Sequence, residues 1–258
     1  MKKIQLFVLA LAGFAVTSQA APAVTGFADS VVSYNPGTGY SAQFTNPSVV
    51  LGEPSTVNPY GEDVDVFNPP YGTNQIVSIG AGGSLTVKFK TPILNHPHNR
   101  FGIDFMIYGN SGFIITNDFD FDTFDWVGTP ATDGSLFAQN TGETRVSVSS
   151  DGKKFYVLNP AMASTVDGLY PTDGEGDFHT PVDPILTAED FSGQTADGIW
   201  AFYEGSAGGT GYDISWAQKE NGKPAKLHSI RYIRIEVLSG KSEVGGFSAV
   251  FMPHGLNK

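Results

Sequence analysis

Apolar and polar residues alternate along much of the chain, and this pattern predicts β-strands. In residues 229–238, SIRYIRIEVL, the apolar side chains of Ile233, Ile235 and Val237 occupy every second position. Successive side chains of a strand point to opposite faces of a sheet. The segment is therefore predicted to be a strand that buries these three residues and exposes the polar ones between them.

The same alternation recurs in other segments. It predicts that Leu85, Val87 and Phe89 point inward from 84–89, that Phe101, Ile103, Phe105 and Ile107 point inward from 101–111, and that Phe247, Ala249 and Phe251 point inward from 245–251. Residues 143–158 read as two strands joined at Asp151-Gly152, a dipeptide that suits the positive φ angles of a hairpin turn.

Long polar connections, at 52–74, 109–142 and 159–198, separate these strands. Only 187–193 suggests a helical turn, with Thr187 as N-cap and Asp190 three positions later. Two stretches, GIWAFYE (198–204) and YDISWA (212–217), are interpreted as alternating, so Trp200 in the first and Trp216 in the second are expected in the core. Antiparallel strands with long loops predict an all-β fold, an antiparallel β-sandwich or jelly roll.

The N-terminal 20 residues have the pattern of a signal peptide. Lys2 and Lys3 precede an apolar stretch too short to span a bilayer comfortably, and Ser18-Gln19-Ala20 fits a cleavage site. We therefore expect residues 1–20 to be removed and 21–258 to form one β-sandwich domain. The chain is expected to be exported, and to be periplasmic, secreted or associated with the cell surface.

The composition of the chain limits the classes of partner that it can bind. The chain has no cysteine, so disulfides cannot stabilise it, and its formal net charge of −11 disfavours nucleic acid and anionic lipid. No segment after the first 20 residues is apolar enough to be a transmembrane helix. The sequence also lacks a cysteine nucleophile, GxSxG, HExxH and a phosphate-binding loop, so no catalytic residue is predicted.

Two segments resemble a known family. RVSVSSDGKKFYVL (145–158) and IRYIRIEVLSGKSEVGGFSAVF (230–251) are similar to strands of discoidin-like domains, also called coagulation factor 5/8 type C domains, which have a galactose-binding-like jelly roll. The first half, including FGIDFMIYGN (101–110), is similar to a group of uncharacterised bacterial cell-surface proteins. The resemblance implies a β-sandwich, and such modules bind sugars, lipids or proteins.

The segment NDFDFDTFDW, 117–126, combines four aspartates with four aromatic residues. In an extended strand Asp118 and Asp120 would form an acidic outer face over a phenylalanine-lined inner face. The alternation fails near Asp122-Thr123, which indicates a bulge or turn there. Asp122, Asp125 and Trp126 follow this break and are the candidates for ligand binding.

A candidate calcium site lies in PTDGEGDF, 171–178. Asp173, Glu175 and Asp177 alternate with two glycines, which would let the backbone curl until the three carboxylates face one point. The alternative interpretation is a flexible acidic loop. A further acidic group, Glu62, Asp63 and Asp65, lies in a proline-rich loop and is a weaker candidate.

Loop aromatics complete the candidate site. Tyr71, Trp126 and Tyr170 are expected in loops, where a ring can stack on the apolar face of a sugar. These features favour an exported, non-catalytic binding module for a glycan or another cell-envelope ligand, with calcium as a structural aid. Two alternatives stay open, a secreted carbohydrate-active enzyme and a structural surface or matrix protein. The sequence leaves the oligomeric state open.

Overall fold

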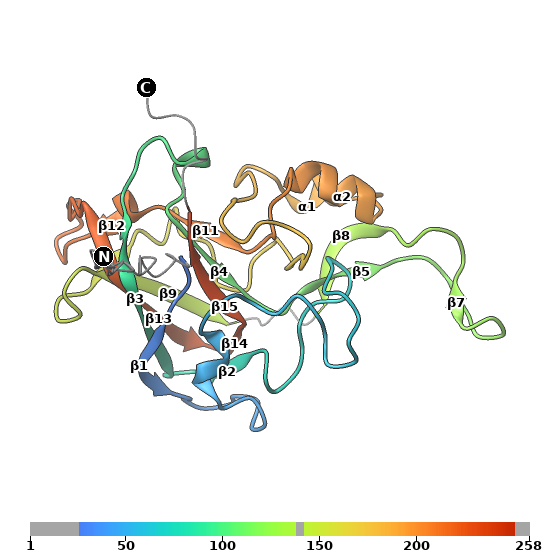
Figure 1. The fold of residues 1–258 in the computed structure, drawn as a ribbon, viewed down its shortest axis with the longest axis horizontal. Coiled ribbons are helices and arrows are strands. Elements are labelled where there is room, and N and C mark those ends of the chain that lie inside the picture. Colours follow the sequence, from blue (N-terminus) through green and yellow to red (C-terminus); the bar gives the residue numbers. More distant parts are fainter. Residues whose placement is uncertain (1–25, 138–141, 251–258) are drawn as a thin grey trace, which may run out of the picture.

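A computed structural model of the chain describes residues 26–137 and 142–250. Its largest sheet has six strands in the order β1-β3-β13-β9-β10-β12, and every neighbouring pair is antiparallel (Figure 1). These strands are β1 (Ser30–Asn35), β3 (Ser84–Leu94), β9 (Glu143–Ser149), β10 (Tyr156–Leu158), β12 (Ala217–Gln218) and β13 (Ser229–Ser239).

A second layer packs against the inner face of this sheet. It contains the three-stranded sheet β11-β4-β15 and the pair β14-β2. The bounds are β2 (Val77–Gly80), β4 (Phe105–Tyr108), β11 (Thr210–Tyr212), β14 (Lys241–Val244) and β15 (Gly246–Ala249). The main core lies between the layers, because apolar residues of β3, β9 and β13 pack there with residues of β4, β11 and β15. The predicted antiparallel β-sandwich is confirmed.

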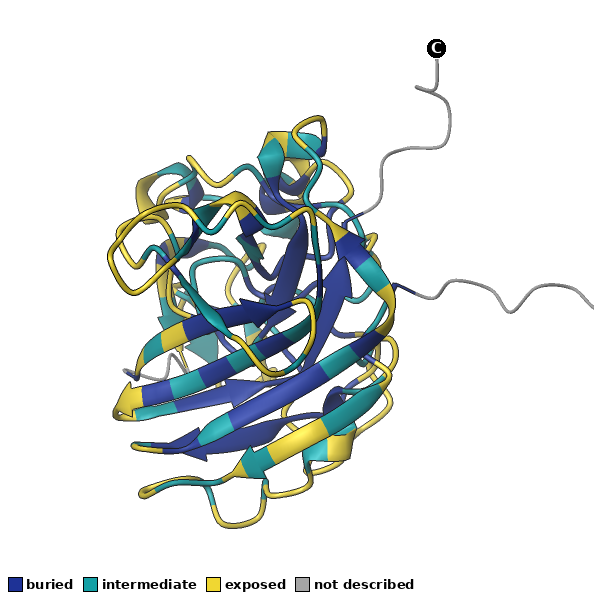
Figure 2. Cartoon of the chain, turned by 90° about the vertical axis from the view of Figure 1, so that its left-hand side faces the viewer, coloured by how far each residue is buried: buried dark blue, intermediate teal, exposed yellow. Residues whose placement is uncertain are grey.

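The alternation in the sequence predicted which residues face this core. Ile233 and Ile235 are fully buried, and Val237 and Phe247 are at most 1% exposed. Along the strands of the large sheet, buried residues alternate with less buried ones (Figure 2). Phe251, also predicted to be buried, lies outside the described residues.

The strand predicted from Phe101 onward starts later. Residues Arg100–Gly102 form a 3-10 turn, η2, and Phe101 is 44% exposed with a φ of 56°. The expected inward position of Phe101 is therefore wrong, whereas Phe105 and Ile107 are buried as predicted. The reason is the turn at 96–102, whose hydrogen bonds prevent an extended backbone until residue 103.

Asp104 holds this turn against the sandwich. One carboxylate oxygen accepts hydrogen bonds from the His96 N–H and the Asn99 amide, and the other accepts one from the Ile214 N–H, at 2.9–3.0 Å. Ile214 begins a second 3-10 turn, η3 (Ile214–Trp216). Burial raises the pKa of Asp104 to about 6; the two backbone hydrogen bonds oppose this shift, and the charge of Asp213 adds to it.

Two short helices lie outside the sandwich. The turn predicted at 187–193 is present as α1 (Ala188–Phe191), and the Thr187–Asp190 capping box is formed. The second helix, α2 (Ala196–Tyr203), corrects the prediction for 198–204, which was taken as alternating. Trp200 is 36% exposed on this helix, so its predicted place in the core is also wrong.

The helix forms because of what it packs against. Ile199 and Tyr203, spaced by one helical turn, are the fully buried pair of α2. They join a small apolar cluster with Phe113 and Phe191, separate from the main core. Trp216 is half-buried in η3 and packs at the edge of two clusters.

The predicted loop 109–142 contains a projecting arm. Strands β5 (Gly112–Ile115) and β8 (Thr132–Phe137) pair to form its base, and β6 (Phe119–Asp120) and β7 (Asp125–Trp126) pair near its tip. The arm extends away from the sandwich (Figure 1). At its base Gly134, with a φ of 88°, lets β8 approach α1 closely, since a Cβ there would lie 2.0 Å from the Ala188 carbonyl oxygen.

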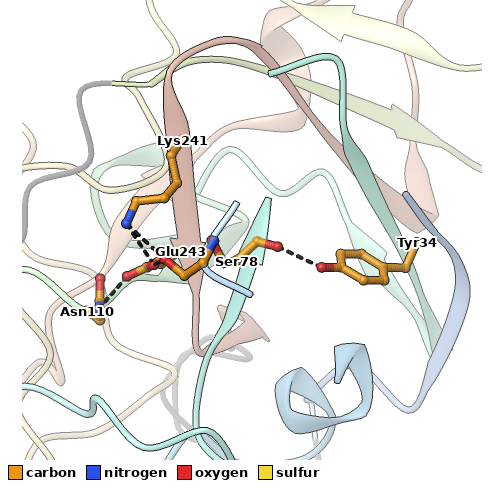
Figure 3. A network of polar contacts seen from close by, with 6 residues as sticks. Tyr34, Ser78, Asn110, Lys241 and Glu243 are labelled. Carbon is orange, nitrogen blue, oxygen red and sulfur yellow. Dashed lines mark hydrogen bonds and ion pairs between the residues drawn. The ribbon is translucent and has the colours of Figure 1, made fainter. Parts of the chain in front are cut away.

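A partly buried ion pair lies within β14, and hydrogen bonds to its carboxylate connect the strand to its surroundings (Figure 3). Glu243 is 6% exposed, and its carboxylate lies 3.1 Å from the Lys241 ammonium. It also accepts hydrogen bonds from the Ser41 hydroxyl and the Asn110 amide. Burial alone would raise the pKa of Glu243, but these hydrogen bonds and the lysine charge outweigh it and lower the pKa.

In the described part of the chain, no helix has the length and hydrophobicity needed to cross a membrane.

Removing a core side chain from β13 tests the strand register. Ile235→Ala leaves a cavity between the layers and is expected to lower the free energy of unfolding by about 2–5 kcal/mol, measured by urea denaturation. Leu238→Ala, at a site on the same strand that is 45% exposed, should cost less than about 0.5 kcal/mol. Equal losses in the two variants would contradict the register.

The environment of Asp104 predicts a pH effect. Because its folded-state pKa, about 6, lies above the ordinary 3.8, protonation of Asp104 stabilises the fold. That contribution is complete below about pH 4 and is lost as the pH rises through about 6. Asp213→Asn removes the neighbouring charge, so the Asp104 carboxyl should titrate at lower pH, followed by carbon-13 NMR of the aspartate side chains.

The exposed Asp118→Asn makes the same change of formal charge and serves as the control. It should leave the pKa of the Asp104 carboxyl unchanged. If Asp213→Asn also left this pKa unchanged, the charge of Asp213 would not contribute to raising it.

Candidate ligand-binding site

The residues predicted to bind ligand lie on three separate parts of the structure. Trp126, Asp122 and Asp125 belong to the hairpin at the tip of the arm, Tyr71 lies in the loop before β2, and Tyr170 lies beneath α1. No hydrogen bond or ring contact joins residues of one part to those of another in the described chain. Each part is therefore considered separately.

At the arm tip, residues 117–126 form a hairpin rather than one straight strand. Asp120 accepts hydrogen bonds from the N–H groups of Asp122 and Thr123, which fold the chain back at the place where the alternation fails. The predicted turn near Asp122-Thr123 is present. The prediction that phenylalanine side chains line a buried inner face is wrong. Phe121 and Phe124 are each 80% exposed, because no layer covers the hairpin.

Tyr170 has a structural role. Its hydroxyl donates to the carbonyl oxygens of Asp183 and Leu186, at 3.1 and 3.0 Å, and its ring packs edge-on against Phe191. Burial raises its pKa to about 12. The side chain therefore fastens the 183–186 loop under the helices, and its ring is partly exposed, so ligand binding by Tyr170 stays a prediction.

Tyr71 lies beside another tyrosine. It is 38% exposed, and its ring centroid is 6.2 Å from that of Tyr60, which is 81% exposed. The sequence analysis did not select Tyr60. The two rings form a small aromatic surface on the 58–71 loop, next to Glu62.

The predicted calcium ligands are engaged within their own loop. The Asp177 carboxylate accepts hydrogen bonds from the His179 N–H and the Thr180 hydroxyl, and Asp173 accepts one from the Glu175 N–H. Burial raises the pKa of Asp173 to about 6, the Glu175 N–H opposes this, and the charges of Glu175 and Asp65 add to it. The structure thus brings Asp65, from the other acidic group, close to Asp173.

Within 26–137 and 142–250, no group of three His, Asp or Glu side chains is arranged to hold a metal ion. Calcium binding by Asp173, Glu175 and Asp177 stays a prediction, because the side chains would have to turn toward a common ion.

The structure also contains a groove that the sequence analysis missed. It lies at the edge of the six-stranded sheet, between β10 and the turn after β12, and has a volume of about 680 Å³. Nine residues line it: Lys153, Lys154, Phe155, Tyr156, Val157, Gln218, Lys219, Glu220 and Asn221.

The loop between β9 and β10 builds one wall of the groove. Asp151 accepts hydrogen bonds from the N–H groups of Lys153 and Lys154, which fixes the loop in place. The turn is longer than the predicted two-residue hairpin. Gly152, with a φ of 73°, lies against the Tyr232 ring, where a Cβ would come within 2.8 Å of the ring.

Cationic side chains orient the two aromatic rings of this wall. The Arg234 guanidinium lies 3.8 Å from the Phe155 ring centroid, and the Lys154 ammonium lies 5.2 Å from that of Tyr156. Both rings are half-buried. Each ring thus lies beside the groove and is partly exposed, and the Tyr156 side chain also packs against the main core.

The turn after β12 builds the other wall. The Lys219 N–H donates to the Lys223 carbonyl, and the Asn221 side chain accepts a hydrogen bond from the Lys223 N–H. Lys219, Glu220 and Asn221 are exposed at the rim. The groove thus combines two rings, two amide side chains and three ammonium groups.

Positive charge is concentrated around this groove. Segments 151–158 and 217–234 contain seven of the chain's 15 Lys and Arg residues but two of its 26 Asp and Glu residues. The rest of the chain is strongly acidic. This clustering is visible in the sequence, but the structure shows that the two segments meet, for example where Val157 pairs with Gln218.

The chain was compared with protein families, with curated proteins and with solved structures. No protein-family model matches it, so the resemblance to discoidin-like domains stays a prediction. No curated protein matches it either. Among solved structures, a pectin-binding carbohydrate-binding module matches with a TM-score of 0.31 and 9% sequence identity, over 88% of this chain and 94% of that chain. At so low a TM-score, neither the fold nor the ligand of that protein is carried over to this chain.

Calcium binding can be tested by melting. A metal that binds only the folded state stabilises it by about 2.7 kcal/mol at a hundredfold excess over its dissociation constant. The melting temperature should therefore rise with calcium and fall with a chelator. Asp173→Asn with Asp177→Asn should abolish the response, and Asp118→Asn with Asp120→Asn, on the distant hairpin, should keep it. A melting temperature that does not change when calcium is added or removed would contradict the prediction.

Proposed function

We propose that this protein is an exported, non-catalytic glycan-binding module that holds an acidic polysaccharide in the groove formed by β10 and the turn after β12, called here the β10–β12 groove. The observation that carries the proposal is the set of groups in that groove. Phe155 and Tyr156 supply ring surface, Gln218 and Asn221 supply amides, and three lysines line the same walls.

These groups match the chemistry of an acidic sugar. Aromatic rings stack on the apolar C–H face of a pyranose, and amide side chains both donate to and accept from its hydroxyl groups. Lysine ammonium groups pair with carboxylate or sulfate substituents. A local cluster of lysines favours an anionic ligand over a neutral one. The chain has a net charge of −11, so the remaining surface repels anions and the lysine cluster is the place where an anionic ligand would bind.

The buried carboxyls favour binding over hydrolysis. A glycosidase needs a carboxylic acid of raised pKa that reaches the glycosidic oxygen. Asp65, Asp104 and Asp173 have a raised pKa, but Asp104 is fully buried and Asp173 is 5% exposed. All three carboxylates accept hydrogen bonds from backbone N–H groups of their own turns or of a neighbouring loop. Burial raises the pKa of each, and the hydrogen bonds oppose this shift and assign the carboxylates a structural role.

The binding proposal predicts a preference among polysaccharides. Residues 21–258 should bind alginate or polygalacturonate more tightly than dextran in affinity electrophoresis or calorimetry, and the binding should weaken as salt is added. Lys153→Gln with Lys219→Gln should weaken binding of the acidic polymer by about tenfold, equivalent to about 1.4 kcal/mol. Phe155→Ala should weaken it as well, through loss of stacking.

Lys90→Gln is the matched control, since Lys90 is exposed on β3 and does not line the groove. It should leave the affinity unchanged. Failure to bind any polysaccharide would contradict the proposed function, and equal effects of the groove and control substitutions would contradict the location.

A further inference from the structure

The tip of the arm exposes a cluster of aromatic side chains. Phe119 lies at its centre, with ring centroids 5.2, 5.6 and 5.1 Å from those of Phe121, Phe124 and Trp126. Phe121 and Phe124 are 80% exposed, and the adjacent Val127 is 58% exposed. A contiguous exposed apolar patch of this kind marks an interaction surface.

All charged residues of the arm are acidic. Residues 101–144 contain no Lys or Arg, and four aspartates, Asp118, Asp120, Asp122 and Asp125, lie in the tip hairpin among the rings. A partner for this tip therefore has to offer both apolar surface and positive charge.

The β10–β12 groove offers both, in the same protein. Its walls contain two aromatic rings and three lysines, and the segments around it hold seven of the 15 basic residues. Its volume of about 680 Å³ is large enough to accept several side chains. The tip and the groove are thus complementary in charge and alike in aromatic character.

One molecule cannot bring its own tip to its own groove. The arm extends to one end of the long axis, and β12 with the β9–β10 connection lies at the other end (Figure 1). Points that are far apart in a projection are at least as far apart in space.

We propose that the arm tip of one molecule docks in the β10–β12 groove of a second copy. Asp122 and Asp125 pair with the lysines of the groove, and Phe121 and Phe124 lose their exposure to water against Phe155 and Tyr156. Because the two surfaces differ, the contact is heterologous, and repetition of it generates open head-to-tail chains.

Charge selects this arrangement over the alternatives. Contact between two tips would bring eight aspartates together, and contact of a tip with an anionic membrane would oppose like charges. Docking in the groove instead brings the aspartates to three lysines, against the single carboxylate of Glu220. The inference does not depend on the groove binding a glycan, although an acidic glycan would compete with the tip for the same lysines.

Two variants with complementary defects test the proposal. The tip variant carries Phe121→Ser and Phe124→Ser, and the groove variant carries Lys153→Glu and Lys219→Glu; all four positions are exposed. In sedimentation velocity, the weight-average mass of the unmodified protein should rise with concentration and fall back toward the monomer as salt is added. Each variant alone should remain monomeric.

A mixture of the two variants gives the decisive result. The groove variant still has an intact tip and the tip variant still has an intact groove, so an equimolar mixture should form a one-to-one dimer and nothing larger. Circular dichroism and melting of each variant confirm that it is folded. As a second test, Asp122→Lys with Asp125→Lys introduced into the groove variant itself should restore its self-association, because both charges of the contact are then reversed in every molecule.

Three outcomes would overturn the inference. These are an unmodified protein that stays monomeric at all concentrations, a groove variant that still self-associates, which would indicate tip-to-tip contact, and a mixture that forms no dimer. The proposed function is tested separately, because the tip variant keeps its groove. Loss of glycan binding in all forms would contradict the proposed function and leave the result of the mixture unaffected.

Discussion

The pairing of β13 with β3 on one side and β9 on the other is the interaction on which the rest of the structure depends. Its register places Ile233, Ile235 and Val237 in the core between the two layers. The same register puts Arg234 on the outer face, where its guanidinium donates to the Thr86 hydroxyl and lies over the Phe155 ring. Because the side-chain period of a strand is two, a slip of one residue would expose the isoleucines and remove the support of Phe155 together.

Charge is distributed as unevenly as hydrophobicity. The arm carries carboxylates without any basic residue, and the groove region carries lysines and arginines with few acids. Buried charges are treated differently. Glu243 is compensated by Lys241, Ser41 and Asn110 (Figure 3), whereas Asp104 has no basic partner among its hydrogen bonds, and the backbone N–H groups that hold it do not fully offset the effect of burial on its pKa. The two exposed regions of opposite charge are thus left for partners, since the structure does not neutralise them internally.

The sequence left open whether the protein is a binding module or a structural protein, and the groove and the arm supply one surface suited to each role. A binding module needs ring surface and polar groups on a rigid support, and the edge of the six-stranded sheet supplies them at β10 and β12. A structural or matrix protein needs surfaces that join copies, and the exposed rings at the arm tip have the character of such a surface. The two roles meet in one set of lysines, so a ligand and a second copy would bind in competition there.

The sequence by itself determined the all-β class and most of the core, because strand alternation is a local property. Ile233, Ile235, Val237 and Phe247 could be placed without knowledge of their partners. So could the α1 capping box, since Thr187 and Asp190 are three residues apart. The tertiary structure decided α2, because the apolar residues of 198–204 fit either an alternating or a helical period. The cluster around Phe113 and Phe191 selected the helix.

Only the tertiary structure decided where binding surfaces form. The hairpin at 117–126 has the composition of a half-buried strand, and Phe121 and Phe124 are exposed because no second layer reaches the arm. The groove required Val157 and Gln218, about sixty residues apart, to pair across β10 and β12. Composition and local periodicity describe one segment at a time, whereas burial and the meeting of distant lysines depend on which segments the fold brings together.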